Sequence, residues 1–197
     1  MGWVAAGLSA DVGAGMSIPG RCGETDIALW RSVSGVLHAW NDRCPHRGMR
    51  LSHGFVRGET LACIYHGWRY GTTGACNHIP AHPTLTPPKS VTATVYSCTE
   101  SDGIIWVTSK ETEKPAPTLK GTEPLRSLNV QATPAQIAAH LDCAPAQILH
   151  HRDVTLVLQE YDADHTYIHA LCRSGTDKKT ASRDLETLRR AAERSVQ

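Results

Sequence analysis

Two short clusters, each combining a cysteine with a histidine, constrain this chain more than any other feature of its sequence. They lie in RCPHRGMRLSHG, residues 43–54, and in CIYHGWRYGTTG, residues 63–74. The four side chains are Cys44, His46, Cys63 and His66. Thiolates and imidazoles are donors that bind transition metals, among them zinc and iron. The clusters therefore predict a metal centre, and the order of the donors decides between these two metals.

The order of the donors favours iron. Zinc sites of the Cys2His2 finger type keep both cysteines in one cluster and both histidines in the other. Here each cluster contributes one cysteine and one histidine, first as C-x-H and then as C-x2-H. This mixed order suits two adjacent irons bridged by sulfides, of which one takes both thiolates and the other takes both imidazoles. We therefore predict a [2Fe-2S] cluster rather than zinc.

The residues around the donors resemble a known family. CPHRG and CIYHGWRY resemble the ligand loops of Rieske proteins, and YHGWRYGTTGACNHIP is similar to the Rieske domain of ring-hydroxylating and demethylating oxygenases. The resemblance covers roughly residues 20–108. It implies a Rieske-type [2Fe-2S] cluster, in which the two cysteines hold the iron that stays ferric and the two histidines hold the iron that takes the electron.

Three neighbouring positions bear on the reduction potential. Met49 and Trp68 stand where respiratory Rieske proteins carry an extra cysteine and a serine, both of which raise the potential in that family. Tyr70 stands where the family has its tyrosine. The resemblance therefore implies a potential near the low end of the Rieske range, at about −150 mV.

Composition and pattern predict a mainly β fold. The chain has 197 residues with 41% hydrophobic and 20% charged content, and its 11 prolines and 16 glycines favour short strands and turns. DIALWRS and VLHAWND read as a hairpin joined through Ser34 and Gly35, and SVTATVYSC and GIIWVTS read as later strands. We expect a small antiparallel β sandwich of Rieske type over residues 1–110, with two cluster-binding loops at strand ends.

The rest of the chain predicts a linker and a small α+β extension. Residues 111–127 are polar and proline-rich, which is typical of a linker. Over residues 128–197 we expect a helix that begins at Thr133 and Pro134, then a hairpin in VTLVLQEYDADHTYIHALC, then a second helix. The apolar positions of that second helix recur at helical spacing, at Ala181, Leu185, Leu188 and Ala192.

An oxygenase of the resembled family would also hold a mononuclear iron through two histidines and one carboxylate. Asp142 and His150 fit the expected spacing, but Pro145 stands where the first histidine belongs. Four other residues stay open as substitutes: Asp162, His165, His169 and Asp184. Because DADH reads as a hairpin turn, we predict no complete mononuclear iron site and name no catalytic residue. Whether the chain is an enzyme or only an oxidoreductase component is left open.

Charge and composition argue against several other classes. A net charge of +1 gives no electrostatic footprint for nucleic acid. No apolar run approaches the roughly 20 residues that cross a bilayer, and the N-terminus does not read as a secretion signal. Seven cysteines are an odd number at irregular spacing, which argues against a disulfide framework. We therefore expect a cytoplasmic protein without membrane or nucleic-acid partners.

Three functions remain open from the sequence. The chain is an electron carrier serving a non-heme iron oxygenase, the Rieske-bearing subunit of a hetero-oligomeric oxygenase, or a non-enzymatic redox sensor. Without a nicotinamide or flavin fingerprint it needs a reductase or ferredoxin as electron donor and an oxygenase partner, and its oligomeric state stays open. Five arginines near the clusters predict either a positive rim that docks such a partner or ordinary solvated charges: Arg43, Arg47, Arg50, Arg57 and Arg69.

Overall fold

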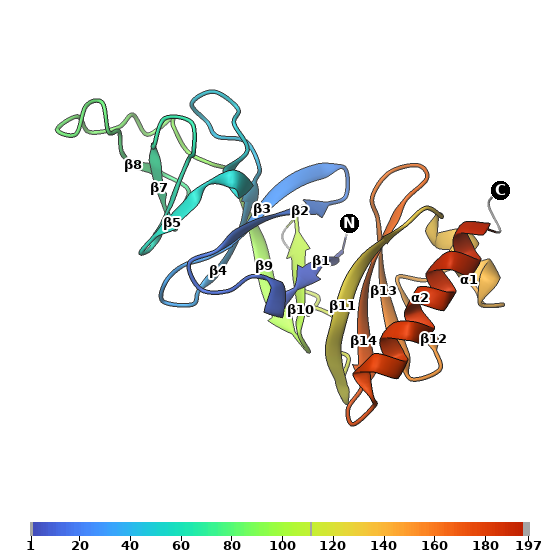
Figure 1. Ribbon diagram of the computed structural model, residues 1–197. Coiled ribbons are helices and arrows are strands. Elements are labelled where there is room, and N and C mark those ends of the chain that lie inside the picture. The colour runs from blue at the N-terminus through green and yellow to red at the C-terminus, as the bar shows by residue number, and fades with distance from the viewer. Residues whose placement is uncertain (1, 111, 195–197) are drawn as a thin grey trace. The chain divides into compact units, whose positions relative to one another are not determined.

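The computed structural model describes residues 2–110 and 112–194 (Figure 1). Contacts divide the chain into two compact units. The first unit is formed mainly by Ser9–Thr99 and Val107–Pro115. The second unit combines Trp3–Leu8, Glu100–Trp106 and Ala116–Gln197. No helix among the described residues is long and apolar enough to cross a bilayer.

The first unit is built from two antiparallel groups of strands. The larger group has the neighbour order β9-β4-β3-β2, and the smaller has the order β5-β6-β7-β8. The strands of the larger group are β2 (Ser17–Cys22), β3 (Thr25–Arg31), β4 (Leu37–Asn41) and β9 (Val95–Ser101). Those of the smaller group are β5 (Phe55–Arg57), β6 (Thr60–Ala62), β7 (Arg69–Gly71) and β8 (Cys76–His78). Two 3-10 turns, η1 (Ser9–Asp11) and η2 (Leu51–His53), complete the unit.

The predicted hairpin is confirmed, and it supplies the core of the first unit. β3 and β4 pair antiparallel with Ala28 opposite Trp40, and Gly35 has a φ of +94° in the connecting turn. Trp30 and Trp40 are fully buried and meet edge to face at 4.9 Å between ring centroids. The same core cluster contains Cys44 and Cys63, so the predicted ligand loops rest directly on it.

The second unit is a four-stranded antiparallel sheet with two helices (Figure 1). Its strands follow the order β11-β14-β13-β12. They are β11 (Thr122–Val130), β12 (Ile148–His151), β13 (Val154–Glu160) and β14 (Thr166–Arg173). The helices are α1 (Pro134–His140) and α2 (Lys178–Arg194). β1 (Val4–Leu8) also belongs to this unit and lies beside β10 (Ile104–Thr108).

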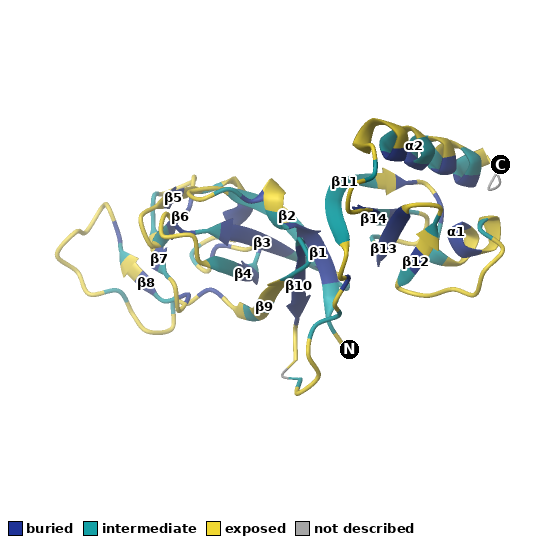
Figure 2. Ribbon diagram, turned by 90° about the horizontal axis from the view of Figure 1, so that it is seen from below, coloured by how far each residue is buried: buried dark blue, intermediate teal, exposed yellow. Residues whose placement is uncertain are grey.

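Both predicted helices are confirmed. α1 begins with a capping box, because the Thr133 hydroxyl accepts from the Gln136 amide at 3.2 Å and the Gln136 side chain accepts from the Thr133 amide at 2.8 Å. α2 buries the predicted apolar positions on one side, as the dark blue stripe in Figure 2 shows. These positions pack in one core cluster with Leu156, Ile168 and Ala170 of the sheet.

The structure departs from the sequence expectations at two strands. β11 starts at Thr122, so the last six residues of the predicted linker 111–127 are strand, and Glu111 lies outside the described residues. Pro124 argued against a strand in the sequence, because proline has no amide proton to donate to a neighbouring strand. The structure tolerates it because β11 is an edge strand of its sheet and its register shifts next to Pro124. In SVTATVYSC only the part from Val95 is strand in β9.

Candidate metal centre

The first cluster forms a tight six-residue loop after β4. The Cys44 amide donates to the Met49 carbonyl at 2.8 Å, and the Gly48 amide donates to the Cys44 carbonyl at 2.8 Å. Gly48 has a φ of +73°, a left-handed conformation that a residue with a Cβ adopts only at a cost. This turn buries Cys44 to 4% exposure and leaves His46 partly exposed.

The second cluster forms an equivalent loop after β6. The Cys63 amide donates to the Trp68 carbonyl at 2.9 Å, and the Gly67 amide donates to the Cys63 carbonyl at 2.9 Å. Gly67 has a φ of +69°, and a Cβ there would come within 3.1 Å of the Pro80 side chain. Cys63 is 2% exposed, whereas His66 is exposed. The two loops therefore share one hydrogen-bonding pattern, with the histidine third in one and fourth in the other.

The structure brings the four predicted donors together. The rings of His46 and His66 lie 4.8 Å apart between centroids. The two thiols are close enough that Cys44 raises the pKa of Cys63, in addition to the larger effect of burial. The thiols lie in the core and the imidazoles at the surface. A cluster held here would thus be shielded on its cysteine side and approachable on its histidine side.

Two aromatic side chains hold the imidazoles. Trp68 stacks face to face on His46, with 4.0 Å between ring centroids and 5° between ring planes. Tyr65 lies over His66 at 3.9 Å between ring centroids. Partial burial and the neighbouring charges of His66 and Arg47 lower the pKa of His46, which favours the neutral imidazole that a metal requires. The sequence predicted neither of these two ring contacts, because the spacing of residues along the chain does not show which side chains stack.

Tyr70 contacts the buried cysteine side. Its hydroxyl lies 3.0 Å from the Cys44 sulfur, and the tyrosine is fully buried. Burial and the nearby Cys44 raise the pKa of Tyr70 far above its usual value. The phenol therefore keeps its proton and can donate it in a hydrogen bond to a Cys44 thiolate.

Comparison with known protein families matches residues 2–95 to the family described as the Rieske [2Fe-2S] domain. This part of the chain is a Rieske domain. The cofactor that such a domain implies is a Rieske-type [2Fe-2S] cluster, and the donor set fits it: two buried thiols and two surface imidazoles on matched loops.

The described residues contain no group of three His, Cys, Asp or Glu arranged for a single metal ion. The four donors are not such a group, because a Rieske cluster takes two protein donors per iron.

Proteins that resemble the Rieske domain include several oxidoreductases. Over 84 residues the chain is 44% identical to Oxidoreductase NdmD of Pseudomonas putida, covering 42% of this chain and 14% of that protein. Over 54 residues it is 56% identical to 4beta-methylsterol monooxygenase of Methylococcus capsulatus, covering 27% and 15%. Over 109 residues it is 37% identical to the 3-chlorobenzoate-3,4-dioxygenase oxygenase subunit of Comamonas testosteroni, covering 53% and 25%. The chain thus spans a quarter or less of each of these relatives.

Solved structures resemble the chain beyond the Rieske domain. NdmB of Pseudomonas putida CBB5 aligns with a TM-score of 0.78 at 15% identity, over 98% of this chain and 80% of that chain. Apo dicamba monooxygenase aligns with a TM-score of 0.75 at 17% identity, over 98% and 82%. At these identities the likeness shows the fold alone. It confirms the mainly β, Rieske-like fold, and it includes the second unit.

The substitute donors of the second unit do not form one group. His165 bonds Asp162 at 2.9 Å on an exposed turn, as the hairpin prediction required. His169 is instead buried in β14 between Ser127 at 2.8 Å and Gln159 at 3.2 Å. Both ring nitrogens of His169 are therefore occupied by hydrogen bonds.

The remaining candidates are also engaged or apart. Asp184 pairs with Arg152 at 2.7 Å. His150 bonds Thr155 at 3.1 Å in β12, whereas Asp142 and Pro145 lie exposed in the preceding loop.

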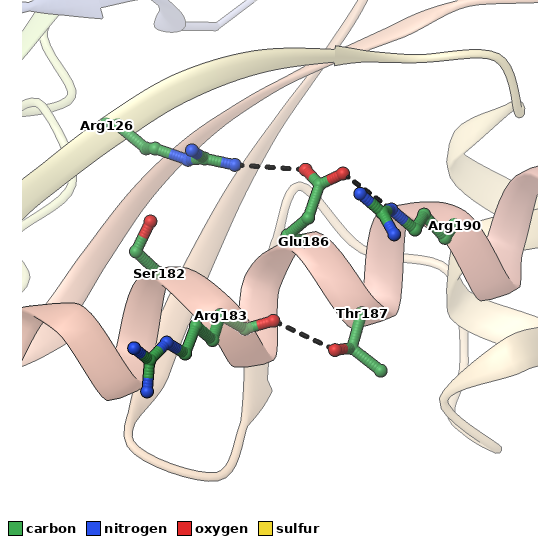
Figure 3. A pocket seen from close by; sticks show the side chains of 6 residues that line it. All are labelled: Arg126, Ser182, Arg183, Glu186, Thr187 and Arg190. Atoms are coloured by element: carbon green, nitrogen blue, oxygen red, sulfur yellow. Dashed lines mark hydrogen bonds and ion pairs between the residues drawn. The ribbon is translucent and has the colours of Figure 1, made fainter.

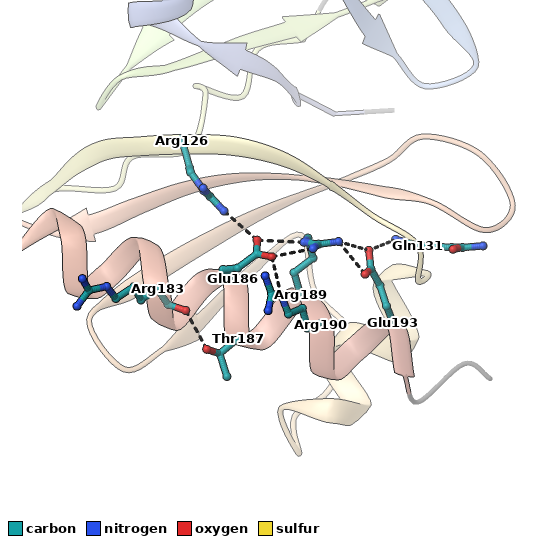
Figure 4. A network of polar contacts seen from close by, with 8 residues as sticks. All are labelled: Arg126, Gln131, Arg183, Glu186, Thr187, Arg189, Arg190 and Glu193. Atoms are coloured by element: carbon teal, nitrogen blue, oxygen red, sulfur yellow. Dashed lines mark hydrogen bonds and ion pairs between the residues drawn. The ribbon is translucent and has the colours of Figure 1, made fainter.

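A pocket between β11 and α2 has a structural explanation. It is lined by Arg126, Ser182, Arg183, Glu186, Thr187 and Arg190 (Figure 3). Glu186 bonds Arg126 at 3.2 Å and Arg190 at 2.9 Å, so two of the three arginines already have an anionic partner. Figure 4 shows the same network continuing through Arg189 and Glu193 to the Gln131 amide. We interpret this network as a set of ion pairs and hydrogen bonds that stabilises the packing of α2 against β11.

Proposed function

We propose that this chain carries single electrons within a non-heme iron oxygenase system, with its cluster held by Cys44, His46, Cys63 and His66. When bound, the cluster supplies reversible one-electron redox chemistry at the low end of the Rieske range, at about −150 mV. The observation that carries the proposal is the pair of equivalent loops, which bury both thiols and present both imidazoles at the surface.

The side chains around the loops perform three tasks in this proposal. The hydrophobic core beneath Cys44 and Cys63 excludes water from the thiolates. Tyr70 donates a hydrogen bond to the Cys44 sulfur, which stabilises the more negative, reduced state. Trp68 and Tyr65 fix the planes of the two imidazoles, so that a partner protein meets them in one orientation.

A second candidate is the Rieske-bearing subunit of a hetero-oligomeric oxygenase. It is favoured by the fold likeness of NdmB and dicamba monooxygenase, which includes the second unit as well as the Rieske domain. In this case a partner would supply the mononuclear iron. Both candidates require an electron-donating reductase or ferredoxin and an oxygenase partner.

Metal analysis with electron paramagnetic resonance tests the first proposal. Purified protein should contain about two irons and two labile sulfides per chain, and its reduced form should give a Rieske-type signal. Replacement of Cys44 or Cys63 by Ser should abolish the signal, because a thiolate ligand is lost. Zinc in place of iron, or iron without labile sulfide, would contradict the proposal.

The same preparation separates the two candidate functions. An electron carrier should keep about two irons per chain in any buffer that contains ferrous iron. A partner that copurifies and adds a third iron per complex would favour the oxygenase subunit. A third iron bound by this chain alone, and lost on replacing His165 or His169, would contradict both assignments.

A further inference from the structure

Asp42 is a buried carboxylate at the start of the first cluster loop. It directly follows β4 and precedes Cys44 by two positions. Asp42 is 1% exposed, and among the described residues it is the only aspartate or glutamate that the fold buries. Taking a carboxylate out of water is costly unless hydrogen bonds and an opposite charge compensate it. The partners of Asp42 therefore indicate what this burial achieves.

These partners lie at the far end of the same loop. Asp42 Oδ1 accepts a hydrogen bond from the Ser52 amide at 2.7 Å, and Oδ2 accepts one from the Ser52 hydroxyl at 2.7 Å. Arg50, one of the five arginines near the clusters, donates to Oδ2 at 3.4 Å and to Asp26 at 2.8 Å. One side chain thus joins the start of the loop to its end, and the two predicted ligands of this loop lie between them in the sequence.

The second cluster loop is closed in a different way. Its two ends are neighbouring strands of one sheet, because β6 and β7 pair antiparallel with Ala62 opposite Arg69. The first loop instead connects β4 of the larger group of strands with β5 of the smaller group, and in the described sheets β4 and β5 are not neighbours. The Asp42 carboxylate takes the place of this missing strand pairing, because it accepts the backbone amide of Ser52.

Geometry rather than stability explains a buried ion pair at this position. Apolar residues of similar volume often stabilise a fold as well as a buried ion pair does, so the Asp42–Arg50 pair is weak evidence for a contribution to stability. Hydrogen bonds, in contrast, have preferred directions and lengths. Those of Asp42 fix the separation between the two ends of the loop, and they thereby limit where the Cys44 sulfur can lie.

We propose that Asp42 is a positioning residue for the predicted cluster: its carboxylate holds the first loop in the ligand-binding geometry before the cluster is inserted. The inference rests on the proposed function, because it concerns the same site. Asp42 acts through Ser52 and Arg50 rather than as a ligand, because both of its oxygens are engaged by them. Its negative charge, two positions from Cys44, also opposes the extra electron of a reduced cluster and lowers the reduction potential.

Hydrogen exchange in the whole chain tests the positioning, measured by mass spectrometry in the cluster-free protein. Asp42→Asn keeps the shape of the side chain but removes its charge and one acceptor oxygen. Exchange of the amides at 43–52 should become about tenfold faster, whereas exchange at 63–68 should change less than about twofold. Equal acceleration in both loops would reduce Asp42 to a general stabiliser of the fold, and unchanged exchange at 43–52 would also overturn the inference.

Asp26→Asn is the matched control. Asp26 also pairs with Arg50, but its side chain is 42% exposed and it lies outside both loops. This variant should change exchange in the first loop less than about twofold. Acceleration as large as in Asp42→Asn would assign the effect to the charge balance of Arg50 and overturn the role of Asp42.

Ser52→Ala covers the case in which Asp42→Asn does not fold. It removes only the hydroxyl donor and keeps both the carboxylate and the backbone amide that binds it. Exchange in the first loop should still rise about threefold more than exchange in the second loop. An equal rise in the two loops would contradict the positioning role.

A redox titration of the cluster-loaded protein gives a readout that a merely structural role would not move. Asp42→Asn should raise the reduced-to-oxidised ratio at a fixed ambient potential about threefold, which corresponds to about 30 mV. Ser52→Ala retains the charge and should leave this ratio nearly unchanged. An unchanged or lower potential in Asp42→Asn would overturn the charge effect.

Metal analysis keeps these tests separate from the proposed function. Iron and labile sulfide are measured first for each protein. A wild-type chain that takes up no [2Fe-2S] cluster refutes the proposed function. A loaded wild-type chain whose Asp42→Asn variant exchanges like the wild type refutes only the role of Asp42.

Discussion

At the residue scale, Tyr70 is the side chain that most directly tunes the predicted cluster. It comes from β7, 26 positions after Cys44, and its hydroxyl reaches the buried sulfur at 3.0 Å. Tyr70→Phe should remove this donor and leave the packing nearly intact. A hydrogen bond to a charged group contributes about 1.5–3 kcal/mol net. The bond is stronger in the reduced state than in the oxidised state, and only this difference shifts the potential, so the potential should fall by tens of millivolts, at about 59 mV for each tenfold change in the equilibrium constant. Protein-film voltammetry measures the change, and a rise or an unchanged potential would show that Tyr70 does not donate to the sulfur.

At the element scale, the two ligand loops are equivalent in hydrogen bonding but differ in their surroundings. Gly48 and Gly67 both adopt positive φ, so an alanine at either position should cost about 1–2 kcal/mol of folding free energy. Space around Gly48 is open, whereas a Cβ at Gly67 approaches Pro80 at 3.1 Å. Gly67→Ala should therefore destabilise the protein more than Gly48→Ala, and it should lose more iron. Denaturant melts and iron content measure both, and equal effects would mean that Pro80 moves aside without cost.

At the scale of the whole molecule, the buried His169 couples stability to pH. Burial lowers its pKa to about 4, from an ordinary value of 6.5. The contribution of neutral His169 to the free energy of unfolding is therefore fully present above pH 6.5. It is lost as the pH falls from 6.5 through 4, because the histidine of the unfolded chain binds a proton at a higher pH than the buried histidine does. The free energy of unfolding should fall by about 3 kcal/mol over this range from His169 alone.

Urea unfolding at several pH values measures this dependence. His169→Gln should flatten the profile between pH 6.5 and 4, although the variant starts from a lower stability because the polar contacts of the buried site change. His82→Gln, at an exposed loop position, should keep the wild-type slope. A His169→Gln profile as steep as that of the wild type would assign the pH dependence to other groups.

The sequence by itself determined the features that depend on neighbouring positions. The mixed order of the four donors predicted the [2Fe-2S] cluster, and the comparison with the Rieske domain supports that cofactor. The N-cap residue Thr133 with Pro134 after it, and the helical spacing from Ala181 to Ala192, predicted both helices correctly. Such signals survive without a structure because capping, turn formation and helical periodicity act over about four residues.

Only the tertiary structure decided the contacts between distant positions. It placed Tyr70 on Cys44 and Trp68 on His46, and it separated His169 from Asp162. It also showed β11 in a segment that its prolines had marked as linker, because an edge strand tolerates a missing amide proton. Strand pairing and burial join residues far apart in the chain, so they depend on how the whole chain folds back on itself, which no local pattern encodes.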